Sequence, residues 1–350
     1  MLRGAISGFG EVAAQAHIAG WRTRPGVAIV AIHDPASARR HQAINLLKNV
    51  RVYDDLDLML DGEALDFVDI ASPPAFHTAS VRKALAAGAH VLVEKPACFS
   101  SAELDGLAAL AAARARVLMC VQNWKYAPAY RRAHELIAAG RLGDLRHVSL
   151  TRLRRGPAGA GGSAVGGERW RLDPKTGGGI LIDHGWHVFY LMQWLMGGDA
   201  PARVAAHLGR PDGSRLDDLA DLRIEFPRGR IAAAHLSWRS PVRRTSAMIY
   251  GAEAMLEIEG DRIALTDRSG ASEDLSVSDL PDDSYHAAWF AGMAADFERA
   301  IDAGCDGSIV GENRAEVRAA VALTEGSMRS AEAAGARVPI TLQSAISRAI

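Results

Sequence analysis

A glycine-rich hexapeptide close to the N-terminus has the residue types that bind a dinucleotide. It reads Gly8-Phe9-Gly10-Glu11-Val12-Ala13 and fits the pattern G-x-G-x-x-A, between a predicted strand and a predicted helix. Gly8 permits a tight turn, Gly10 lets the backbone approach a pyrophosphate, and Ala13 lets the helix pack closely on the strand. The N–H groups that begin the helix would face the phosphates. We expect the cofactor to contact Gly8, Phe9, Gly10, Glu11 and Val12.

One acidic and two basic residues bear on which dinucleotide binds. Asp34 ends the second predicted strand, 21 residues after Ala13, where a carboxylate accepts hydrogen bonds from the ribose hydroxyls of adenosine. Its charge favours NAD because it would repel a 2′-phosphate. Arg39 and Arg40 lie on the next helix and could reach such a phosphate, so NADP stays open. The alternative for the whole pattern is a glycine turn beside a solvated aspartate.

A carboxylate and an imidazole lie four residues apart in the second half of the chain. Asp183 and His187 fall near the start of an otherwise apolar helix, and their spacing places them on one face. His187 can act as a general base on a hydroxyl, because the ordinary pKa of an imidazole is about 6.5. Asp183 can orient the imidazole or bind the substrate. The structural alternative is an Asp–His hydrogen bond that holds the helix end.

A second histidine stands beside this pair. On a helix, His184 points about 100° away from Asp183, and we expect it to contact the substrate or to support the pair. Asp183, His184 and His187 could also suggest a metal, but they lack a separated third ligand, and we predict no metal site.

A lysine follows the strand predicted at 89–93. Lys95 lies just past the C-terminal end of this strand, where open α/β sheets place their ligands, and Pro96 restricts the backbone after it. Lys95 can polarise the oxygen that His187 deprotonates and stabilise developing alkoxide charge. Glu94 is expected to partner the cofactor or the lysine. A solvated lysine in a turn is the alternative.

The first part of the chain alternates strands with helices, which predicts a doubly wound parallel sheet. The predicted strands are 2–7, 27–32, 65–71, 89–93 and 117–121, and the predicted helices include 11–19, 76–87 and 101–114. Pro35 is expected in the first turn of a further helix that follows the strand 27–32. Ser100 or Ser101 is the expected N-cap of the helix 101–114. Gly88 is expected to follow the C-terminal end of the helix 76–87.

The second part changes character near Gln122. Helices are predicted at 128–139, 180–196, 286–303 and 312–334, and strands at 145–153, 202–209, 219–226, 230–238, 245–250, 254–259 and 262–266. A run of strands without intervening helices predicts an open, largely antiparallel sheet. The glycine-rich stretch 156–167 is interpreted as a loop, either a lid or a tolerated insertion.

The sequence therefore predicts an α/β protein of two domains. Residues 1–122 would form an N-terminal Rossmann dinucleotide-binding domain, and residues 123–350 a C-terminal α+β domain with an open, mostly antiparallel sheet for substrate binding and oligomerisation. The last two predicted helices, 286–303 and 312–334, are candidates to pack on the first domain.

Composition supports this division and excludes other classes. A chain of 350 residues is long enough for about two domains. A net charge of -1 argues against a broadly basic nucleic-acid binder, and no stretch is apolar for long enough to span a membrane. The N-terminus does not have the pattern of a secretory signal. Cys98, Cys120 and Cys305 lie too far apart for a disulfide framework, so a cytoplasmic protein is expected.

Three motifs in order resemble the Gfo/Idh/MocA oxidoreductase family. They are the glycine pattern, the tripeptide Glu94-Lys95-Pro96, and a segment from Gly177 to His187 that resembles G-G-G-x-x-x-D-x-G-x-H. The resemblance covers nearly the whole chain. It implies an NAD(P)-dependent oxidoreductase, a Lys–Pro bond that is often cis and projects the lysine into the cleft, and an open sheet that often makes dimer contacts.

Two further segments resemble family motifs with departures. Residues 72–77 are similar to [ST]-P-N-x-x-H, which places Ser72, Pro73 and His77 beside the cofactor, but Pro74 replaces the asparagine. Residues 122–126 are similar to N-x-R-[FY]. Asn123 matches as a cofactor contact, whereas Lys125 replaces the arginine, which makes a bidentate contact to a substrate carboxylate less expected. Lys125 and the balanced charge argue mildly against strongly acidic substrates.

Other residues are expected near the substrate. Trp170 could offer an apolar platform to a sugar and Arg171 hydrogen bonds, so both join Lys95, Asp183, His184 and His187 as predicted substrate contacts. Tyr285 and His286 begin a late helix that either reaches the pocket or lies at the surface.

The function predicted from these residues is hydride transfer between nicotinamide and a hydroxyl or carbonyl of a sugar, inositol or related polyol. Lys95, Asp183 and His187 are the predicted catalytic residues, and Lys95 and His187 must meet at one substrate oxygen. An alternative is an NAD-dependent glycosidase that works by transient oxidation on the same fold. A non-enzymatic, cofactor-sensing regulator is a third. We expect a homodimer or homotetramer.

Overall fold

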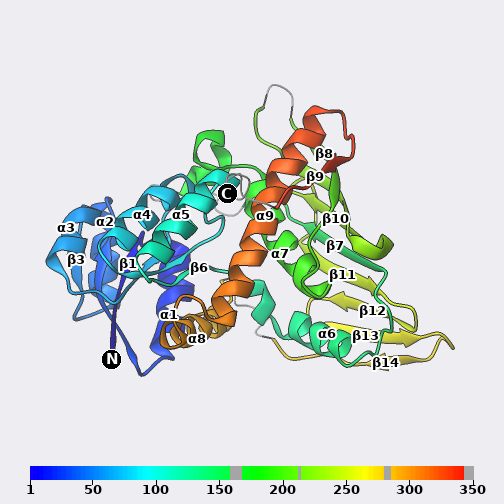
Figure 1. The fold of residues 1–350 in the computed structure, drawn as a ribbon, viewed down its shortest axis with the longest axis horizontal. Coiled ribbons are helices and arrows are strands. Elements are labelled where there is room, and N and C mark those ends of the chain that lie inside the picture. Colours follow the sequence, from blue (N-terminus) through cyan, green and yellow to red (C-terminus); the bar gives the residue numbers. More distant parts are fainter. Residues whose placement is uncertain (158–167, 212–213, 280–284, 343–350) are drawn as a thin grey trace. The chain divides into compact units, whose positions relative to one another are not determined.

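The computed structural model describes residues 1–157, 168–211, 214–279 and 285–342, so the predicted loop 156–167 lies almost entirely outside the described residues. The chain forms two compact units (Figure 1). The first contains residues 1–126 and the described part of 280–315; the second contains the described parts of 127–164, 169–279 and 316–350. No described helix is both long enough and apolar enough to cross a membrane.

The first unit is built on a six-stranded parallel sheet in the order β3-β2-β1-β4-β5-β6. Its strands are β1 (Leu2–Ser7), β2 (Val27–His33), β3 (Arg51–Tyr53), β4 (Phe67–Ile70), β5 (His90–Val93) and β6 (Leu118–Cys120). The order reverses between β1 and β4, and ligands of doubly wound sheets bind beyond the C-terminal strand ends at such a point. The predicted doubly wound sheet is confirmed.

Helices cover both faces of this sheet (Figure 1). They are η1 (Ala13–His17), α1 (Ile18–Arg22), α2 (Ser37–Leu46), α3 (Leu56–Gly62), η2 (Pro74–Phe76), α4 (His77–Ala86), α5 (Ser101–Ala113), η3 (Asn123–Tyr126) and α8 (Ala287–Ala303). On one face, apolar side chains of β1 and β4 pack against Trp21 of α1 and against Phe290 and Phe297 of α8. The late helix α8 thus completes the core of the first unit.

Local signals explain where these elements begin and end. Ser100 and Glu103 form a reciprocal capping box at the start of α5, as a serine N-cap predicted. Gly88 follows α4 with φ +86°, a conformation that suits glycine. Pro35 does not enter the first turn of α2, contrary to expectation. That helix begins at Ser37, because the Asp34 side chain accepts a hydrogen bond from the Ala36 N–H first.

The second unit holds a nine-stranded sheet in the order β14-β13-β12-β11-β7-β10-β9-β8-β15. Only β7 and β10 pair in parallel among the described strands, so the predicted mostly antiparallel sheet is confirmed. The strands are β7 (His147–Leu153), β8 (Arg203–Gly209), β9 (Leu219–Glu225), β10 (Ile231–Ser237), β11 (Arg244–Tyr250), β12 (Ala254–Glu259), β13 (Arg262–Asp267), β14 (Ser272–Asp274) and β15 (Val338–Pro339).

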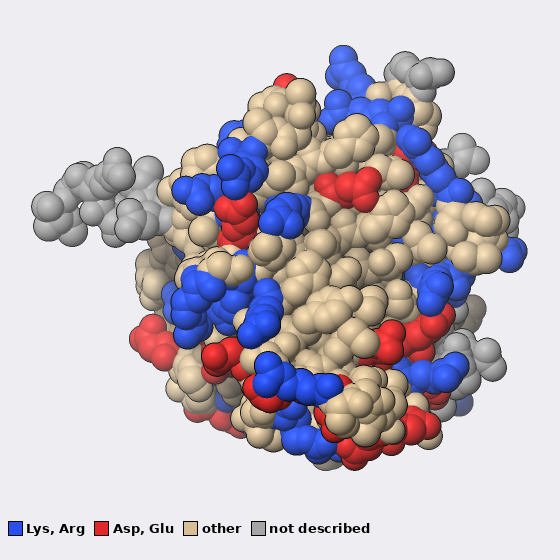
Figure 2. All heavy atoms as spheres, turned by 90° about the vertical axis from the view of Figure 1, so that its right-hand side faces the viewer, with Lys and Arg blue, Asp and Glu red and all other residues tan. Residues whose placement is uncertain are grey.

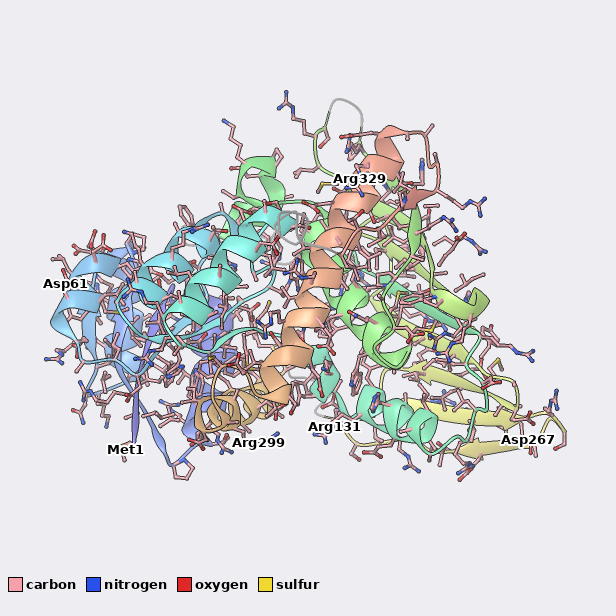
Figure 3. The ribbon with its side chains drawn as sticks, viewed as in Figure 1. Met1, Asp61, Arg131, Asp267, Arg299 and Arg329 are labelled. Carbon is pink, nitrogen blue, oxygen red and sulfur yellow. The ribbon has the colours of Figure 1, made fainter. Side chains whose placement is uncertain are left out.

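Helices pack against one face of this sheet. They include α6 (Pro128–Ala138), η6 (Leu181–Gly185) and α7 (Trp186–Leu195), whereas α9 (Ser308–Glu332) begins in the first unit and ends in the second. Short turns η4 (Glu168–Leu172) and η5 (Pro174–Thr176) lead into η6, and η7 (Pro227–Gly229) joins β9 to β10. Asp267, labelled in Figure 3, ends β13 at the margin of the sheet and accepts a hydrogen bond from the Ser269 N–H.

Residues alternate between the two faces of the sheet because successive side chains of a strand point in opposite directions. Leu222 and Leu236 are buried beneath the helices, whereas Asp221, Arg223 and His235 lie on the outer face. Figure 2 views this side of the second unit, where a broad uncharged area is bordered by charged side chains.

Candidate active site

The glycine turn of the first unit is closed by an aspartate. Gly8 has φ +92°, and a Cβ there would lie 2.5 Å from the Ser72 nitrogen, so no other residue fits. The Phe9 N–H donates to Asp34 Oδ2 at 2.8 Å, and the Ala36 N–H donates to Oδ1 at 2.9 Å. Asp34 therefore holds the turn in addition to its predicted role. Each carboxylate oxygen keeps a further lone pair for a ribose hydroxyl.

The helix after this turn is wound differently from expectation. Residues Ala13–His17 form a π-helical segment, and α1 follows at Ile18. The first hydrogen bond of the turn runs from the Ala14 N–H to the Gly10 oxygen. The N–H groups just before Ala14 have no partner within the helix, as at any helix start. They are available to a phosphate, as predicted for Gly10, Glu11 and Val12.

Arg39 and Arg40 both donate to protein oxygens. Arg39 lies 2.6 Å from Glu11 Oε1 and 2.8 Å from Gln42 Oε1, whereas Arg40 donates to the main-chain oxygens of Asp34 and Pro35. A 2′-phosphate would have to compete with these acceptors. The geometry therefore favours the NAD prediction over the NADP alternative.

Two observations test whether the first unit fits a dinucleotide. A Cβ built on Gly10 meets nothing within 4 Å, so protein packing does not require a glycine there, whereas a close ligand would. Among the described residues, the buried Ser72 Oγ and Asn123 Oδ1 have no hydrogen-bond partner. They follow β4 and β6 at the C-terminal edge of the sheet, and a bound polar group would satisfy them. The unit fits the predicted cofactor.

A buried histidine links the helix of the glycine turn to the lysine motif. His17 Nδ1 lies 2.9 Å from Asp69 Oδ2, and Nε2 lies 3.1 Å from Glu94 Oε1. The other oxygen of Glu94, Oε2, accepts the Lys95 N–H at 2.9 Å. Burial opposes a charge on His17, but Asp69 and Glu94 outweigh it and raise the pKa of His17 to about 9. The imidazolium thus holds Glu94, which sequence reasoning assigned to the cofactor or the lysine.

This network makes stability depend on pH. Because the pKa of His17 rises from 6.5 in the unfolded chain to about 9, its contribution is fully present below pH 6.5 and is lost as pH rises through 9. We expect a loss of about 3 kcal/mol in unfolding free energy across this window, relative to a His17→Gln variant. Urea unfolding of both proteins at several pH values measures it. An NMR titration that finds His17 neutral at pH 7.5 would contradict the expectation.

His77 connects two loops at the same edge of the sheet. Its Nδ1 lies 2.7 Å from the Pro96 oxygen and its Nε2 lies 2.7 Å from the Ser72 oxygen, and the residue is only 1% exposed. Burial lowers the pKa of this imidazole. The side chain therefore braces the loops that carry Ser72 and Lys95, and its contact with the cofactor stays a prediction. The Lys95–Pro96 peptide bond is cis, as the resemblance implied.

The second unit places Asp183 in η6 and His187 in the first turn of α7. Asp183 Oδ2 accepts a hydrogen bond from Arg171 Nε at 3.1 Å and lies 3.8 Å from His184 Nδ1. His187 Nδ1 lies 2.9 Å from the Tyr190 hydroxyl. Asp183 is 2% exposed and His187 is 8% exposed. The residue seen to orient His187 is thus Tyr190, which sequence reasoning did not select.

The remaining predicted contacts are distributed between the units. Arg171 lies over the Trp170 ring at 4.4 Å, so these two predicted substrate residues form one cation–π pair. His184 faces Trp238 edge-on. In the first unit, His286 stacks on Trp289 at the start of α8, and Tyr285 is 38% exposed. Among the described residues, no group of three or more His, Cys, Asp or Glu side chains could hold a metal ion.

Both halves of the chain match family models. Residues 2–122 match an oxidoreductase family with an NAD-binding Rossmann fold, and residues 130–257 match the GFO/IDH/MocA C-terminal domain. The chain belongs to the GFO/IDH/MocA oxidoreductase family. The family predicted from the three motifs is confirmed, as is the fold class predicted from the order of the strands and helices. The protein is an oxidoreductase with an NAD-binding Rossmann domain.

GFO/IDH/MocA proteins of several functions resemble it. D-glucoside 3-dehydrogenase of Escherichia coli is 27% identical over 303 residues, which cover 81% of this chain and 84% of the relative. D-apiose dehydrogenase of Paraburkholderia graminis is 26% identical over 277 residues, 77% of this chain and 70% of the relative. The crystal structure of GenD2 from gentamicin A biosynthesis in complex with NAD has a TM-score of 0.81 at 27% identity, covering 97% of this chain and 96% of that one.

Proposed function

We propose that this family member is an NAD-dependent dehydrogenase of a sugar or polyol hydroxyl. The observation that carries the proposal is a buried His187 that Tyr190 orients, four residues after the buried Asp183. The other unit of the chain offers Lys95 at the edge of an NAD-binding sheet. Relatives named as D-glucoside 3-dehydrogenase and D-apiose dehydrogenase, and GenD2 in complex with NAD, support it.

Each side chain has one task in the proposed reaction. Bound NAD supplies a hydride acceptor, which the residues of this chain do not. With Tyr190 accepting from Nδ1–H, His187 presents the lone pair of Nε2 and takes the hydroxyl proton. Lys95 holds the same oxygen and stabilises its developing negative charge. Asp183, which Arg171 fixes, binds a substrate hydroxyl or supports the imidazole. In the reverse direction His187 or Lys95 returns the proton.

A substrate screen tests the proposal. Inositols, aldoses and ketoses are incubated with NAD or NADP, and reduced cofactor is followed by absorbance. Steady formation of NADH with a free sugar or polyol supports the dehydrogenase. Release of sugar from a glycoside without net NADH would identify the glycosidase instead, and dinucleotide binding without any turnover would favour the regulator.

The cofactor preference predicts the effect of Asp34→Ala. Removing the carboxylate takes away the ribose acceptor and the brace of the glycine turn, so kcat/KM for NAD should fall roughly 10- to 100-fold, the effect of a charge-assisted hydrogen bond. The kcat/KM for NADP should fall less, because the variant also loses the negative charge that would repel a 2′-phosphate. Asp54→Ala, an exposed aspartate in the same region, is the control. A wild-type preference for NADP would contradict the prediction.

We also propose a cytoplasmic homodimer or homotetramer. The outer face of the nine-stranded sheet supports association, because small side chains such as Ala233 and Ser149 lie there between Asp221, Arg223 and His235. Light scattering coupled to gel filtration determines the oligomeric state. A monomer at micromolar concentration would contradict the proposed association.

A further inference from the structure

A chain of hydrogen bonds runs through the interior of the first unit from strand β4 to Lys95. Asp69 lies in β4, which pairs with β1 on one side and with β5 on the other. Its Oδ2 accepts from Trp21 Nε1 at 2.7 Å and lies 2.9 Å from His17 Nδ1. His17 Nε2 lies 3.1 Å from Glu94 Oε1, and Glu94 Oε2 accepts the Lys95 N–H at 2.9 Å. Each link thus fixes the next one.

The main chain at Lys95 benefits from this support because the hydrogen bonds between strands end just before it. The Glu94 N–H still donates to the Ile70 oxygen of β4 at 2.8 Å. The Lys95 N–H donates instead to the side chain of Glu94. A lysine has a flexible four-carbon stem, so accurate placement of its ammonium depends on a fixed main chain at its base.

His17 is held at both ring nitrogens and on its ring face. Asp69 and Glu94 lie at the nitrogens, and the Phe290 ring of α8 stacks on the imidazole with centroids 3.8 Å apart. The His17 side chain is 0% exposed, whereas that of Glu94 is 15% exposed, so the network runs from the interior to the accessible edge of the sheet. Asp69 alone would balance the charge of the imidazolium, and burying a second carboxylate costs free energy. The contact with Glu94 therefore points to a role at Lys95.

We propose that His17 is a positioning residue for Lys95. Acting through Glu94, it fixes the main chain from which the lysine reaches the substrate oxygen, while Asp69 and Phe290 fix the imidazole itself. His17 also ends a π-helical segment, and such segments are frequent at functional sites. The inference rests on the proposed function and adds to it a residue that is itself fully buried.

Two amide variants separate the contacts of His17. The amide nitrogen of glutamine can take the place of Nε2, and that of asparagine the place of Nδ1. His17→Gln can therefore keep the hydrogen bond to Glu94, whereas His17→Asn keeps only the one to Asp69. With the substrate that the screen gives, His17→Asn should lower kcat roughly 10- to 100-fold and His17→Gln only about 2- to 5-fold. The affinity for NADH, from a fluorescence titration, should change far less than kcat.

A double-mutant cycle shows whether the effect passes through the lysine. In a Lys95→Met background there is no ammonium to misplace, so adding His17→Asn should slow a single turnover by less than about 2-fold. The matched control is His90→Gln, because His90 begins the same strand β5 and accepts the Val117 N–H at the opposite end from Lys95. It should leave kcat unchanged. An equal loss from His17→Asn in both backgrounds would make His17 a merely structural residue and overturn the inference.

A second readout needs no substrate. Reductive methylation with isotope-labelled formaldehyde makes the lysine amines of the full protein visible by NMR, and the signal that Lys95→Met lacks belongs to Lys95. With NADH bound, His17→Asn should shift this signal, whereas His90→Gln should leave it in place. An unshifted signal in His17→Asn would contradict the inference.

The stability of His17→Asn is measured separately, because this variant leaves two carboxylates without the imidazolium. If it is unfolded under assay conditions, His17→Asn combined with Asp69→Asn takes its place, with Asp69→Asn as the reference.

The outcomes separate this inference from the proposed function. A Lys95 signal that depends on His17, in a protein without dehydrogenase activity, would uphold the inference and remove the proposed function. Dehydrogenase activity with fully multiplicative losses in the cycle and an unshifted signal would uphold the proposed function and overturn the inference.

Discussion

A His187→Ala variant is expected to turn over substrate about two to four orders of magnitude more slowly than the wild type, the usual contribution of a general acid–base group. The imidazole is 8% exposed and is oriented through Nδ1 by the Tyr190 hydroxyl at 2.9 Å, and in the proposed reaction its Nε2 takes the substrate proton. Steady-state kinetics with saturating NAD measure the loss. NADH binding by the variant should persist, because the glycine turn lies in the other unit.

Tyr190→Phe provides a graded companion to this variant. This variant keeps the imidazole of His187 and removes one hydrogen bond to it. We expect its turnover to fall roughly 2- to 10-fold. Near-normal turnover of His187→Ala would remove His187 from the mechanism.

Lys95→Met is expected to be comparably damaging, with a loss of about two to four orders of magnitude in kcat/KM. Methionine keeps much of the side-chain length but cannot polarise the substrate oxygen or stabilise alkoxide charge. The Lys95 N–H bond to Glu94 involves the main chain and survives, so the network through His17 should persist. Stopped-flow measurement of the first turnover shows whether the hydride step itself is slowed.

The control is Lys83→Met, which removes an exposed lysine paired with Asp57 in the same unit. It should leave kcat/KM unchanged. A double variant carrying His187→Ala and Lys95→Met should lose less than the product of the two single losses if both side chains act on one oxygen. Fully multiplicative losses would separate their roles and contradict the proposed reaction.

Several features could be predicted from short stretches of sequence. The glycine turn needs Gly8 at positive φ, and the start of α5 needs a serine with a glutamate three residues later, so residue type and spacing suffice. Helix α3 could have been predicted in the same way, because Asp55 caps it through the N–H groups of Asp57 and Leu58. Tyr190 lies three residues after His187, a spacing that brings side chains together on a helix.

Other features depend on residues that are distant in the chain. His17 lies 52 residues from Asp69 and 77 residues from Glu94, and nothing near it in the sequence marks it as an imidazolium. His77 was assigned to the cofactor from its motif, but its ring bonds to carbonyls 5 and 19 residues away. Where β7 pairs with β11, the Thr245 hydroxyl accepts a hydrogen bond from Arg152, which lies 93 residues away in the sequence.

By itself, the sequence determined the family, the alternation of elements in the first unit, the strand-rich second unit and the identity of the residues able to move a proton. These follow from turn chemistry and periodicity, which act over a few residues. Tertiary structure decided which charges meet: His17 with Asp69 and Glu94, and Arg171 with Asp183. Electrostatic partners are set by distance in space, and strand pairing brings together residues that the linear order keeps far apart.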